Sequence, residues 1–196
     1  MSDPILLIGS EGNMGQRYQA IMKYLDIPYV CSDINILTDW NRDYHSYLIC
    51  TPTNDHYEQI KQCSKFGKPI LCEKAITKDP SRLIELIDTC DFAMVNQYKY
   101  LVDPTAKGDT YYNYFRTGKD GLNWDCINII GLSKTPAKIM NKSPIWSCMI
   151  NGQELSIKDM DLAYCKMIDR WYKKPYTNKD YIEKAHMKVI EKYYVT

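Results

Sequence analysis

Three glycines stand at an even spacing where an apolar run gives way to a helical pattern, in the segment ILLIGSEGNMG of residues 5–15. In a dinucleotide site, the first glycine of such a loop makes the tight turn, the second lets the backbone approach the pyrophosphate, and the third lets helix and strand pack closely. The N-terminus of the helix then offers free N–H groups and a positive dipole end to phosphate. The predicted cofactor contacts in this loop are Gly9, Gly12, Asn13, Met14 and Gly15.

The spacing G-x-x-G-x-x-G is one residue longer than the common G-x-G-x-x-G. Glu11 lies inside this loop, where a carboxylate is a poor neighbour for phosphate unless it points to solvent. A purely structural turn is the alternative interpretation of the glycines.

An aspartate, Asp33, ends the second apolar run, about 20 residues after the loop as a dinucleotide motif requires. A carboxylate at this place can accept both ribose hydroxyls of NAD and would repel a 2′-phosphate. No arginine follows immediately, because the next residues are Ile34 and Asn35. Asp33 therefore favours NAD over NADP, with NADP still open; a surface turn residue is the alternative.

Apolar runs alternate with helical patterns through the first hundred residues. The expected strands cover 5–9, 28–33, 46–52, 68–74 and 92–98, and the expected helices cover 15–26, 55–67 and 81–90. Asp79 and Pro80 supply an N-cap and a first residue for the last of these helices. Continuous apolar strands that alternate with helices predict an α/β fold, a Rossmann-like, doubly wound parallel sheet.

After about residue 100 the pattern changes to a small α+β region. The tyrosine-rich segment 105–121 suggests a broken helix and a loop, whereas 122–133 is a helix or a strand by its periodicity. A hairpin is predicted around Asn151-Gly152. A helix is predicted from a capping-box pattern at Ser156 and Asp159, and a final helix after Asn178 carries the apolar stripe Ile182, Ala185 and Val189. The predicted division is a dinucleotide-binding Rossmann domain over 1–100 and a reduced substrate or dimerisation region over 101–196.

The composition argues against several classes of partner. Lys+Arg 25 against Asp+Glu 24 gives a net charge of +1, so no global field favours nucleic acid or a membrane. The eight cysteines lack any C-x-x-C pair, and several lie in apolar runs, which favours buried thiols in a reducing compartment. Only three, well-separated histidines occur, so no metal site is predicted. The start of the chain lacks the features of a signal peptide, and the predicted location is cytoplasmic.

Residues 46–80 carry a more specific pattern, SYLICTPTNDHYEQIKQCSKFGKPILCEKAITKDP. A strand ends in Thr51-Pro52, the next helix opens near His56, and a strand that follows Gly67-Lys68 ends in Glu73-Lys74. This segment resembles the Gfo/Idh/MocA oxidoreductases, and the resemblance extends over the first half of the chain to VNQYKY at 95–100.

The resemblance implies a nicotinamide-dependent dehydrogenase or reductase that acts on sugars, polyols or related carbonyl compounds. It places Lys74 near nicotinamide and substrate, where a lysine orients or protonates the reacting oxygen, and makes Glu73 a residue that positions it. A lysine at the carboxyl edge of a strand can donate to a developing alkoxide. The resemblance also implies cofactor contacts from Thr51, Pro52, Asn54, His56 and Glu73.

Two substitutions depart from the family's pattern. The proline after the lysine is Ala75, which favours a trans peptide bond where the family often has a cis one. In GLNWDCINIIG at 121–131, Asp125 fits, but a histidine position falls on Ile129, which has no proton to exchange. Asn128 can hydrogen-bond a substrate without acting as an acid, so the acid is Lys74, Tyr98 or a water. The second half is also shorter than the family's usual substrate-covering sheet.

The leading hypothesis is an NAD(P)-dependent oxidoreductase that moves a hydride between cofactor and a small carbonyl or hydroxyl compound. Its predicted catalytic residues are Lys74 and Tyr98, and its predicted substrate contacts are Lys74, Lys99, Asp125 and Asn128. A non-catalytic nucleotide-binding sensor or assembly subunit is the alternative. A third hypothesis is a partner-docking surface formed by Tyr111, Tyr112, Tyr114 and Phe115, with a homodimer as one version of it; tyrosines packed inside a small second domain are the alternative.

Overall fold

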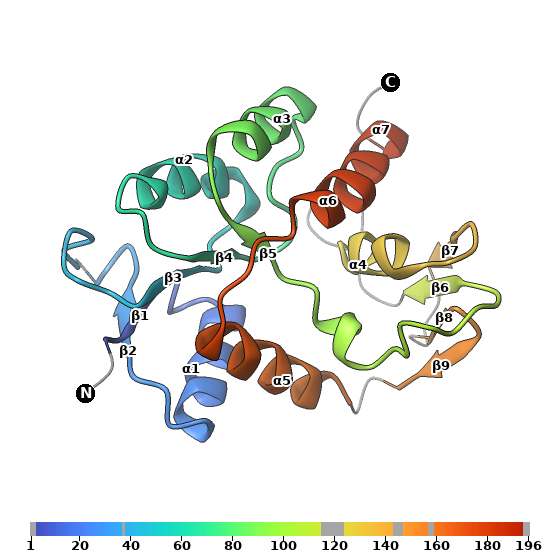
Figure 1. Cartoon of the computed structure of the whole chain (residues 1–196), viewed down its shortest axis with the longest axis horizontal. Helices are drawn as coiled ribbons and strands as arrows, with labels where there is room; N and C mark the ends of the chain where they lie inside the picture. Colours follow the sequence, from blue (N-terminus) through green and yellow to red (C-terminus); the bar gives the residue numbers. More distant parts are fainter. Residues whose placement is uncertain (1–2, 37, 115–123, 143–146, 157–158, 194–196) are drawn as a thin grey trace.

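The chain folds as a five-stranded parallel sheet followed by a smaller sheet and three helical segments (Figure 1). The structure, a computed structural model, describes residues 3–36, 38–114, 124–142, 147–156 and 159–193. The first sheet has the order β2-β1-β3-β4-β5, and all of its described pairings are parallel. Its strands are β1 (Ile5–Ile8), β2 (Tyr29–Ser32), β3 (Ser46–Ile49), β4 (Ile70–Cys72) and β5 (Ala93–Met94). The predicted Rossmann-like α/β fold is confirmed.

Helices cover both faces of this sheet because its central strand is apolar on both sides. The three helices between its strands are α1 (Asn13–Tyr24), α2 (Thr53–Ser64) and α3 (Pro80–Thr89). Ile5 and Leu7 of β1 pack in the cluster that contains α1 residues, and Leu6 and Ile8 pack in the cluster that contains α2 and α3 residues. Figure 1 shows α1 on the opposite side of the sheet from α2 and α3. As predicted, Asp79 caps α3, accepting from the Ser81 and Arg82 N–H groups.

The second sheet has the order β7-β6-β8-β9. Its strands are β6 (Tyr111–Tyr114), β7 (Lys138–Lys142), β8 (Ser147–Ile150) and β9 (Gln153–Leu155). β6, β8 and β9 pair antiparallel, and β7 lies parallel to β6. The predicted hairpin is confirmed, with Asn151 at φ 53° and Gly152 at φ 77°.

Two segments of the second half differ from or refine the sequence prediction. The prediction of a broken helix and a loop over 105–121 is wrong where the chain forms β6. Tyrosines favour strands, and Tyr112 pairs with Cys148 of β8. The segment left open between helix and strand forms α4 (Asp125–Leu132). Tyr112 is fully buried, so the docking-surface hypothesis is wrong for it; Tyr111 is half-buried, and Phe115 lies outside the described residues.

The last helical segments return to the first sheet. α5 (Met160–Lys173) contributes Tyr164, Met167, Ile168 and Trp171 to the cluster that holds α1 and one face of β1. The final segment comprises α6 (Lys179–Ile182), a π-helical turn (Glu183–Met187) and α7 (Lys188–Tyr193), and its predicted stripe Ile182, Ala185 and Val189 is buried. The division of the chain near residue 100 stays a prediction.

One predicted cap, that of Asn178, is wrong. α5 begins at Met160 after Asp159, whose side chain does not cap it, and residues 157–158, which separate Ser156 from Asp159, lie outside the described residues. Asn178 precedes α6, but its side chain accepts from the Met94 N–H at 2.8 Å and donates to the Met94 carbonyl at 2.8 Å. The amide therefore occupies the main-chain groups of the edge strand β5 instead of the end of its own helix.

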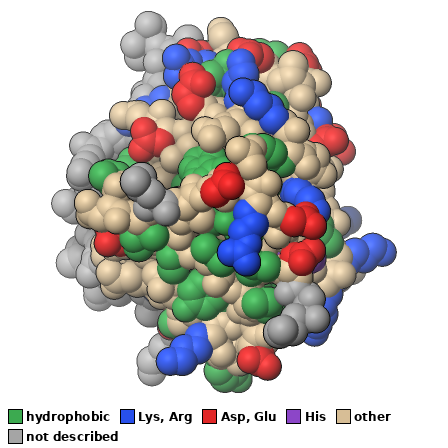
Figure 2. Space-filling view, turned by 90° about the vertical axis from the view of Figure 1, so that its left-hand side faces the viewer, with side chains coloured by type: hydrophobic (Ala, Val, Ile, Leu, Met, Phe, Trp, Pro, Cys, Tyr) green, Lys and Arg blue, Asp and Glu red, His purple; other side chains and the backbone are tan. Residues whose placement is uncertain are grey.

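The structure also shows the state of the cysteines and the placement of charged side chains. All eight cysteines are free thiols, six of them buried, as predicted. Within the described ranges, no helix combines the length and the apolar character needed to cross a bilayer. On the face drawn in Figure 2, basic and acidic side chains are interspersed, in keeping with the nearly balanced charge.

Removal of the Asn178 amide is expected to destabilise the fold. Asn178→Ala leaves one N–H and one carbonyl of β5 without this partner, so we expect the free energy of unfolding to fall by about 2 kcal/mol in urea denaturation. Asn41→Ala, at an exposed position, is the control and should unfold like the wild type. Equal midpoints for both variants would contradict the role of Asn178.

Candidate functional site

The glycine loop joins the carboxyl end of β1 to α1 as a tight cradle. Gly9 has φ +89°, and a Cβ there would lie 2.7 Å from the Thr51 nitrogen, which places the end of β3 beside the loop. A Cβ on Gly15 would lie 2.2 Å from the Gly9 carbonyl oxygen, so only glycine permits this approach of helix and strand. The first intrahelical bond runs from Gln16 N–H to the Gly12 carbonyl at 2.9 Å. The N–H groups of residues 13–15 precede it and form the anion-binding end of the helix.

Asp33 lies at the end of β2 and closes the loop from the other side. One carboxylate oxygen accepts the Glu11 N–H at 2.8 Å, and the other accepts the Ile34 N–H at 2.7 Å. The Glu11 side chain is exposed, and its carboxylate accepts from the Asn35 amide at 3.1 Å. Glu11 thus turns toward the residues after β2.

Lys74 lies at the end of β4 in a buried polar cluster, and its side chain is 8% exposed. Its Nζ lies 3.2 Å from Asp125 Oδ1, 3.6 Å from Glu73 Oε2, and 3.4 Å from both the Gln97 Oε1 and the Tyr164 OH. Burial alone lowers the pKa of Lys74, but the nearby Glu73, Tyr164 and Asp125 outweigh it, so this pKa lies well above the ordinary value. Lys74 therefore stays protonated at neutral pH.

Sequence reasoning missed three members of this cluster. Tyr18 of α1 donates to Glu73 Oε1 at 2.5 Å, Gln97 follows β5, and Tyr164 comes from α5. Tyr18 and Tyr164 are in edge-to-face contact with ring centroids 5.9 Å apart. The apolar periodicity of the sequence predicts that Tyr18 and Tyr164 are core residues. Only the fold shows that their hydroxyls contact Glu73 and Lys74.

The other predicted substrate residues lie around the cluster at different depths. Asn128 is fully buried, donating to Gln97 Oε1 at 3.0 Å and accepting from the Tyr181 OH at 2.7 Å. Tyr98 is buried, and burial raises its pKa well above the ordinary value. Lys99 is exposed on the short 3-10 turn η1 (Gln97–Tyr100), and Ile129 is buried on α4.

Two buried histidines hold the backbone that follows Lys74. His56 Nδ1 lies 2.7 Å from the Ala75 carbonyl oxygen and its Nε2 lies 2.8 Å from the Thr51 carbonyl oxygen, so it links the ends of β3 and β4. His186, in the π-helical turn, accepts the Ile76 N–H at 2.8 Å through Nε2. The Lys74–Ala75 peptide bond is cis, so the expectation of a trans bond from Ala75 is wrong. Both histidines bind the peptide unit that follows Ala75, through its carbonyl oxygen and its N–H.

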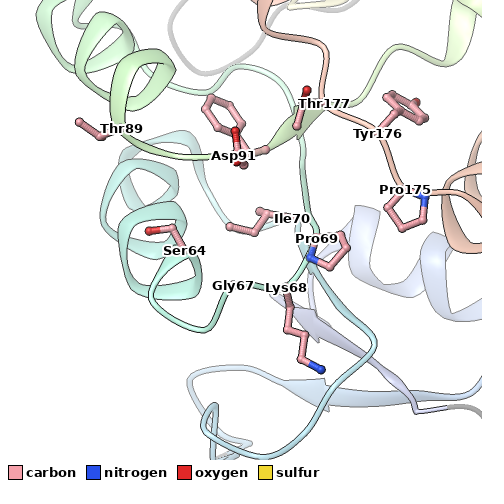
Figure 3. A pocket seen from close by; sticks show the side chains of 11 residues that line it. Ser64, Gly67, Lys68, Pro69, Ile70, Thr89, Asp91, Pro175, Tyr176 and Thr177 are labelled. Carbon is pink, nitrogen blue, oxygen red and sulfur yellow. The ribbon is translucent and has the colours of Figure 1, made fainter.

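Two cavities among the described residues lie at opposite ends of the strands of the first sheet. One of about 550 Å³ opens at the amino ends of β4 and β5, lined by Ser64, Lys68, Asp91, Pro175 and Thr177 among others (Figure 3). A smaller one of about 210 Å³ lies between the starts of α2 and α3, where Asn54 lines it. Ligands of open α/β sheets bind at the carboxyl ends of the strands, so we assign the candidate site to the edge with the glycine loop and Lys74.

No group of three or more metal-ligating side chains gathers within the part of the chain that the structure describes. The arrangement instead combines an anion-binding helix end, a carboxylate at the end of β2 and a charged lysine at the end of β4. These are the parts of a dinucleotide-binding Rossmann domain.

The comparison with protein families agrees with this class. Residues 6–96 match the Gfo/Idh/MocA model, described as an oxidoreductase family with an NAD-binding Rossmann fold. By this match, residues 6–96 form a Gfo/Idh/MocA NAD-binding Rossmann domain. Among curated protein sequences, none matches the chain.

Solved structures of dehydrogenases share the fold. The WlbA (WbpB) dehydrogenase of Thermus thermophilus, solved with NAD and α-ketoglutarate, is 15% identical with a TM-score of 0.69, over 94% of this chain and 92% of that one. The dehydrogenase MviM of Clostridium difficile is 12% identical with a TM-score of 0.71, over 98% of each chain. A myo-inositol dehydrogenase of Corynebacterium glutamicum is 10% identical with a TM-score of 0.69, over 95% of each chain.

Acidification is expected to destabilise the protein through His186. Burial lowers the pKa of His186 from 6.5 to about 3. Between these pH values the folded state binds fewer protons than the unfolded state. The contribution of the neutral His186 to the free energy of unfolding is therefore complete above pH 6.5 and is lost as the pH falls toward 3. We expect a slope of up to about 1.4 kcal/mol per pH unit in urea denaturation of the wild type.

His186→Gln removes this titration and should give a shallower dependence of the unfolding free energy on pH over the same window. Carboxylates titrate in both proteins, so the difference between the two slopes isolates the histidine. Identical slopes would exclude His186 as the source.

Proposed function

We propose that the protein is an NAD(H)-dependent oxidoreductase that exchanges a hydride between nicotinamide and a small polyol- or sugar-like compound. The observation that carries the proposal is Lys74, buried at the carboxyl end of β4 with its Nζ 3.2 Å from Asp125 Oδ1 and 3.6 Å from Glu73 Oε2. The family of the domain supports the cofactor class. When bound, NAD supplies the hydride acceptor, and NADH the donor.

The cofactor end of the site rests on backbone and one carboxylate. The N–H groups of Asn13 and Met14 would hold the pyrophosphate, and the absence of a Cβ on Gly15 keeps the helix end at this position. Asp33 would accept the ribose hydroxyls, which favours NAD over NADP. Thr51, Pro52 and Asn54 lie at the end of β3 and the start of α2, where they would line the cofactor.

His56 and Glu73 fit a positioning role rather than direct contact. His56 is buried between two backbone carbonyls, and Glu73 is buried between Tyr18 and the Lys74 main chain, whose N–H it accepts at 3.1 Å. Both side chains therefore fix the place from which Lys74 acts.

Lys74 would bind and orient the reacting oxygen and stabilise negative charge that develops on it. Its raised pKa makes it a poor proton donor at neutral pH, since efficient general acids have a pKa near the working pH. Its four polar contacts span 3.2–3.6 Å, longer than the 2.7–2.9 Å usual for charge-assisted bonds, so a substrate oxygen can compete for a donor.

The substrate end of the proposal rests on polar side chains near Lys74. Asp125 and the Gln97 amide contact the ammonium, and Asn128 joins the cluster through Gln97. Tyr98 is the alternative catalytic hydroxyl, and Lys99 is an exposed candidate on η1. Hydroxyl-rich compounds match such amide and carboxylate partners, and the myo-inositol dehydrogenase among the similar structures acts on a polyol.

A non-catalytic nucleotide-binding protein is the second candidate. Ile129 replaces the expected histidine with a buried apolar side chain, and Lys74 is already surrounded by polar groups. Either feature suits a domain that keeps the nucleotide without moving a hydride. A homodimer is compatible with both candidates.

Cofactor binding is the first test. NADH should bind the wild type in a fluorescence titration, and Gly15→Ala should weaken binding at least tenfold because a Cβ would lie 2.2 Å from the Gly9 carbonyl. Gly67→Ala is the control for a strained glycine substitution outside the loop: φ +63° disfavours alanine there although a Cβ meets no atom within 4 Å, so this variant should lose stability and keep NADH binding. A wild type that binds neither NADH nor NADPH would refute both candidate functions.

Turnover separates the two candidates. Substitution of the lysine by Lys74→Gln should lower hydride transfer by about 100-fold or more, as loss of a charge-stabilising donor does. Lys74→Arg, which keeps the charge, should have a higher free energy of unfolding than Lys74→Gln in urea denaturation. Hydride transfer is measured by NADH absorbance with a panel of polyols, aldoses and uronic acids.

NADH binding in each variant shows that any loss lies in the chemical step. Cofactor binding without turnover on any member of the panel would favour the non-catalytic candidate.

A further inference from the structure

Glu11 is one of the two residues between Gly9 and Gly12 in the lengthened glycine loop, and its side chain has a defined place. The Glu11 N–H donates to Asp33 Oδ2 at 2.8 Å, and its Oε2 accepts from Asn35 Nδ2 at 3.1 Å. These two bonds hold Glu11 against the segment that follows β2. Two carboxylates, those of Glu11 and Asp33, therefore stand at the end of this strand.

The Glu11 carboxylate is not needed for the shape of the loop. The bond that ties the loop to β2 uses the Glu11 main chain, which any residue other than proline supplies. The side-chain bond to Asn35 joins two exposed groups and adds little stability. The charge of Glu11 thus needs another explanation than folding.

The sequence around Asp33 has no basic residue that could offset the two carboxylates. Between Lys23 and Arg42 the chain has no lysine or arginine, whereas Asp26, Asp33 and Asp39 are acidic. The end of β2 is where the adenine ribose of a dinucleotide lies, with its 2′ position beside the carboxylate. An arginine near this place accommodates a 2′-phosphate in NADP-binding domains.

We infer that Glu11 is a second selectivity residue that excludes the 2′-phosphate of NADP, acting beside Asp33. This inference rests on the proposed cofactor binding. Asp33 has both oxygens engaged by backbone N–H groups and accepts ribose hydroxyls with what remains of its lone pairs. Glu11 has one oxygen on Asn35 and contributes mainly its charge.

The two carboxylates are expected to act additively. A doubly charged phosphate about 5 Å from one carboxylate in a water-like dielectric is disfavoured by about tenfold in affinity. Removal of the Asp33 charge alone leaves Glu11 in place, so it should relax the discrimination only in part.

The test measures the ratio of the dissociation constants of NADP⁺ and NAD⁺ by isothermal titration calorimetry. We expect Glu11→Gln and Asp33→Asn each to lower this ratio about tenfold, and the double variant to lower it about 100-fold. Glu154→Gln, an exposed glutamate on β9, is the matched control and should leave the ratio unchanged.

A second readout separates charge from structure. Exposed charges are screened within a few ångströms at about 1 M salt, so the ratio of the wild type should fall with added salt and that of the double variant should not. Glu11→Lys should lower the ratio further than Glu11→Gln.

Two failures are distinguishable. A wild type that binds NAD⁺, with a Glu11→Gln ratio within twofold of the wild-type value, overturns the inference and leaves the proposed function standing. A wild type that binds neither dinucleotide overturns the proposed function and the inference with it.

Discussion

The buried ammonium of Lys74 is the group around which the two halves of the chain are arranged. A charge at 8% exposure is tolerated only when anionic and polar partners surround it, and removal of one partner of a buried pair costs about 3–5 kcal/mol. These partners come from four places far apart in sequence: the end of β4, η1, the start of α4 and the middle of α5. Asp125 and Tyr164 can reach Lys74 only when α4 and α5 fold back onto the carboxyl edge of the first sheet. The proposed substrate end of the site therefore forms only when the second half of the chain packs against the first sheet.

Side chains of the last helical segment complete the first sheet in a similar way. Asn178 occupies the main chain of the edge strand β5, and His186 occupies the Ile76 N–H after β4. Edge strands and irregular loops carry main-chain groups without partners in the sheet, and neutral side chains satisfy them without bringing a charge into the core. His186 does so only while its ring is unprotonated, because a protonated Nε2 cannot accept a hydrogen bond. The loop that presents Lys74 thus depends on residues more than a hundred positions away in the chain.

The first half was predictable because its information is local. Apolar runs, Pro80 after Asp79, and glycines at a fixed spacing determine strands, a helix start and a cradle within a few residues of themselves. The strand β6 and the role of Asn178 could not be predicted, because both depend on pairing with segments far away in the sequence. The same holds for the cis bond before Ala75, which lacks its usual proline and precedes a peptide unit that His56 and His186 bind. Tyr18 and Tyr164 have the periodicity of core residues, and their hydroxyl contacts follow only from the fold.

The two ends of the candidate site differ in what they need from the rest of the chain. The cradle is made of backbone N–H groups and the closeness of Gly9 and Gly15, so it exists as soon as β1 and α1 pack. The substrate end needs Asp125, Gln97 and Tyr164 in place around Lys74, and hence the whole second half. The cradle can therefore stay the same while the substrate end changes, and the buried Ile129 at the predicted histidine position is such a change. In the proposed reaction, the raised pKa of Lys74 suits a lysine that would hold charge, while a hydroxyl or a water would exchange the proton. The two candidate functions, an oxidoreductase and a nucleotide-binding sensor, therefore need the same glycine-loop cradle. They differ in whether a substrate oxygen reaches the Lys74 ammonium.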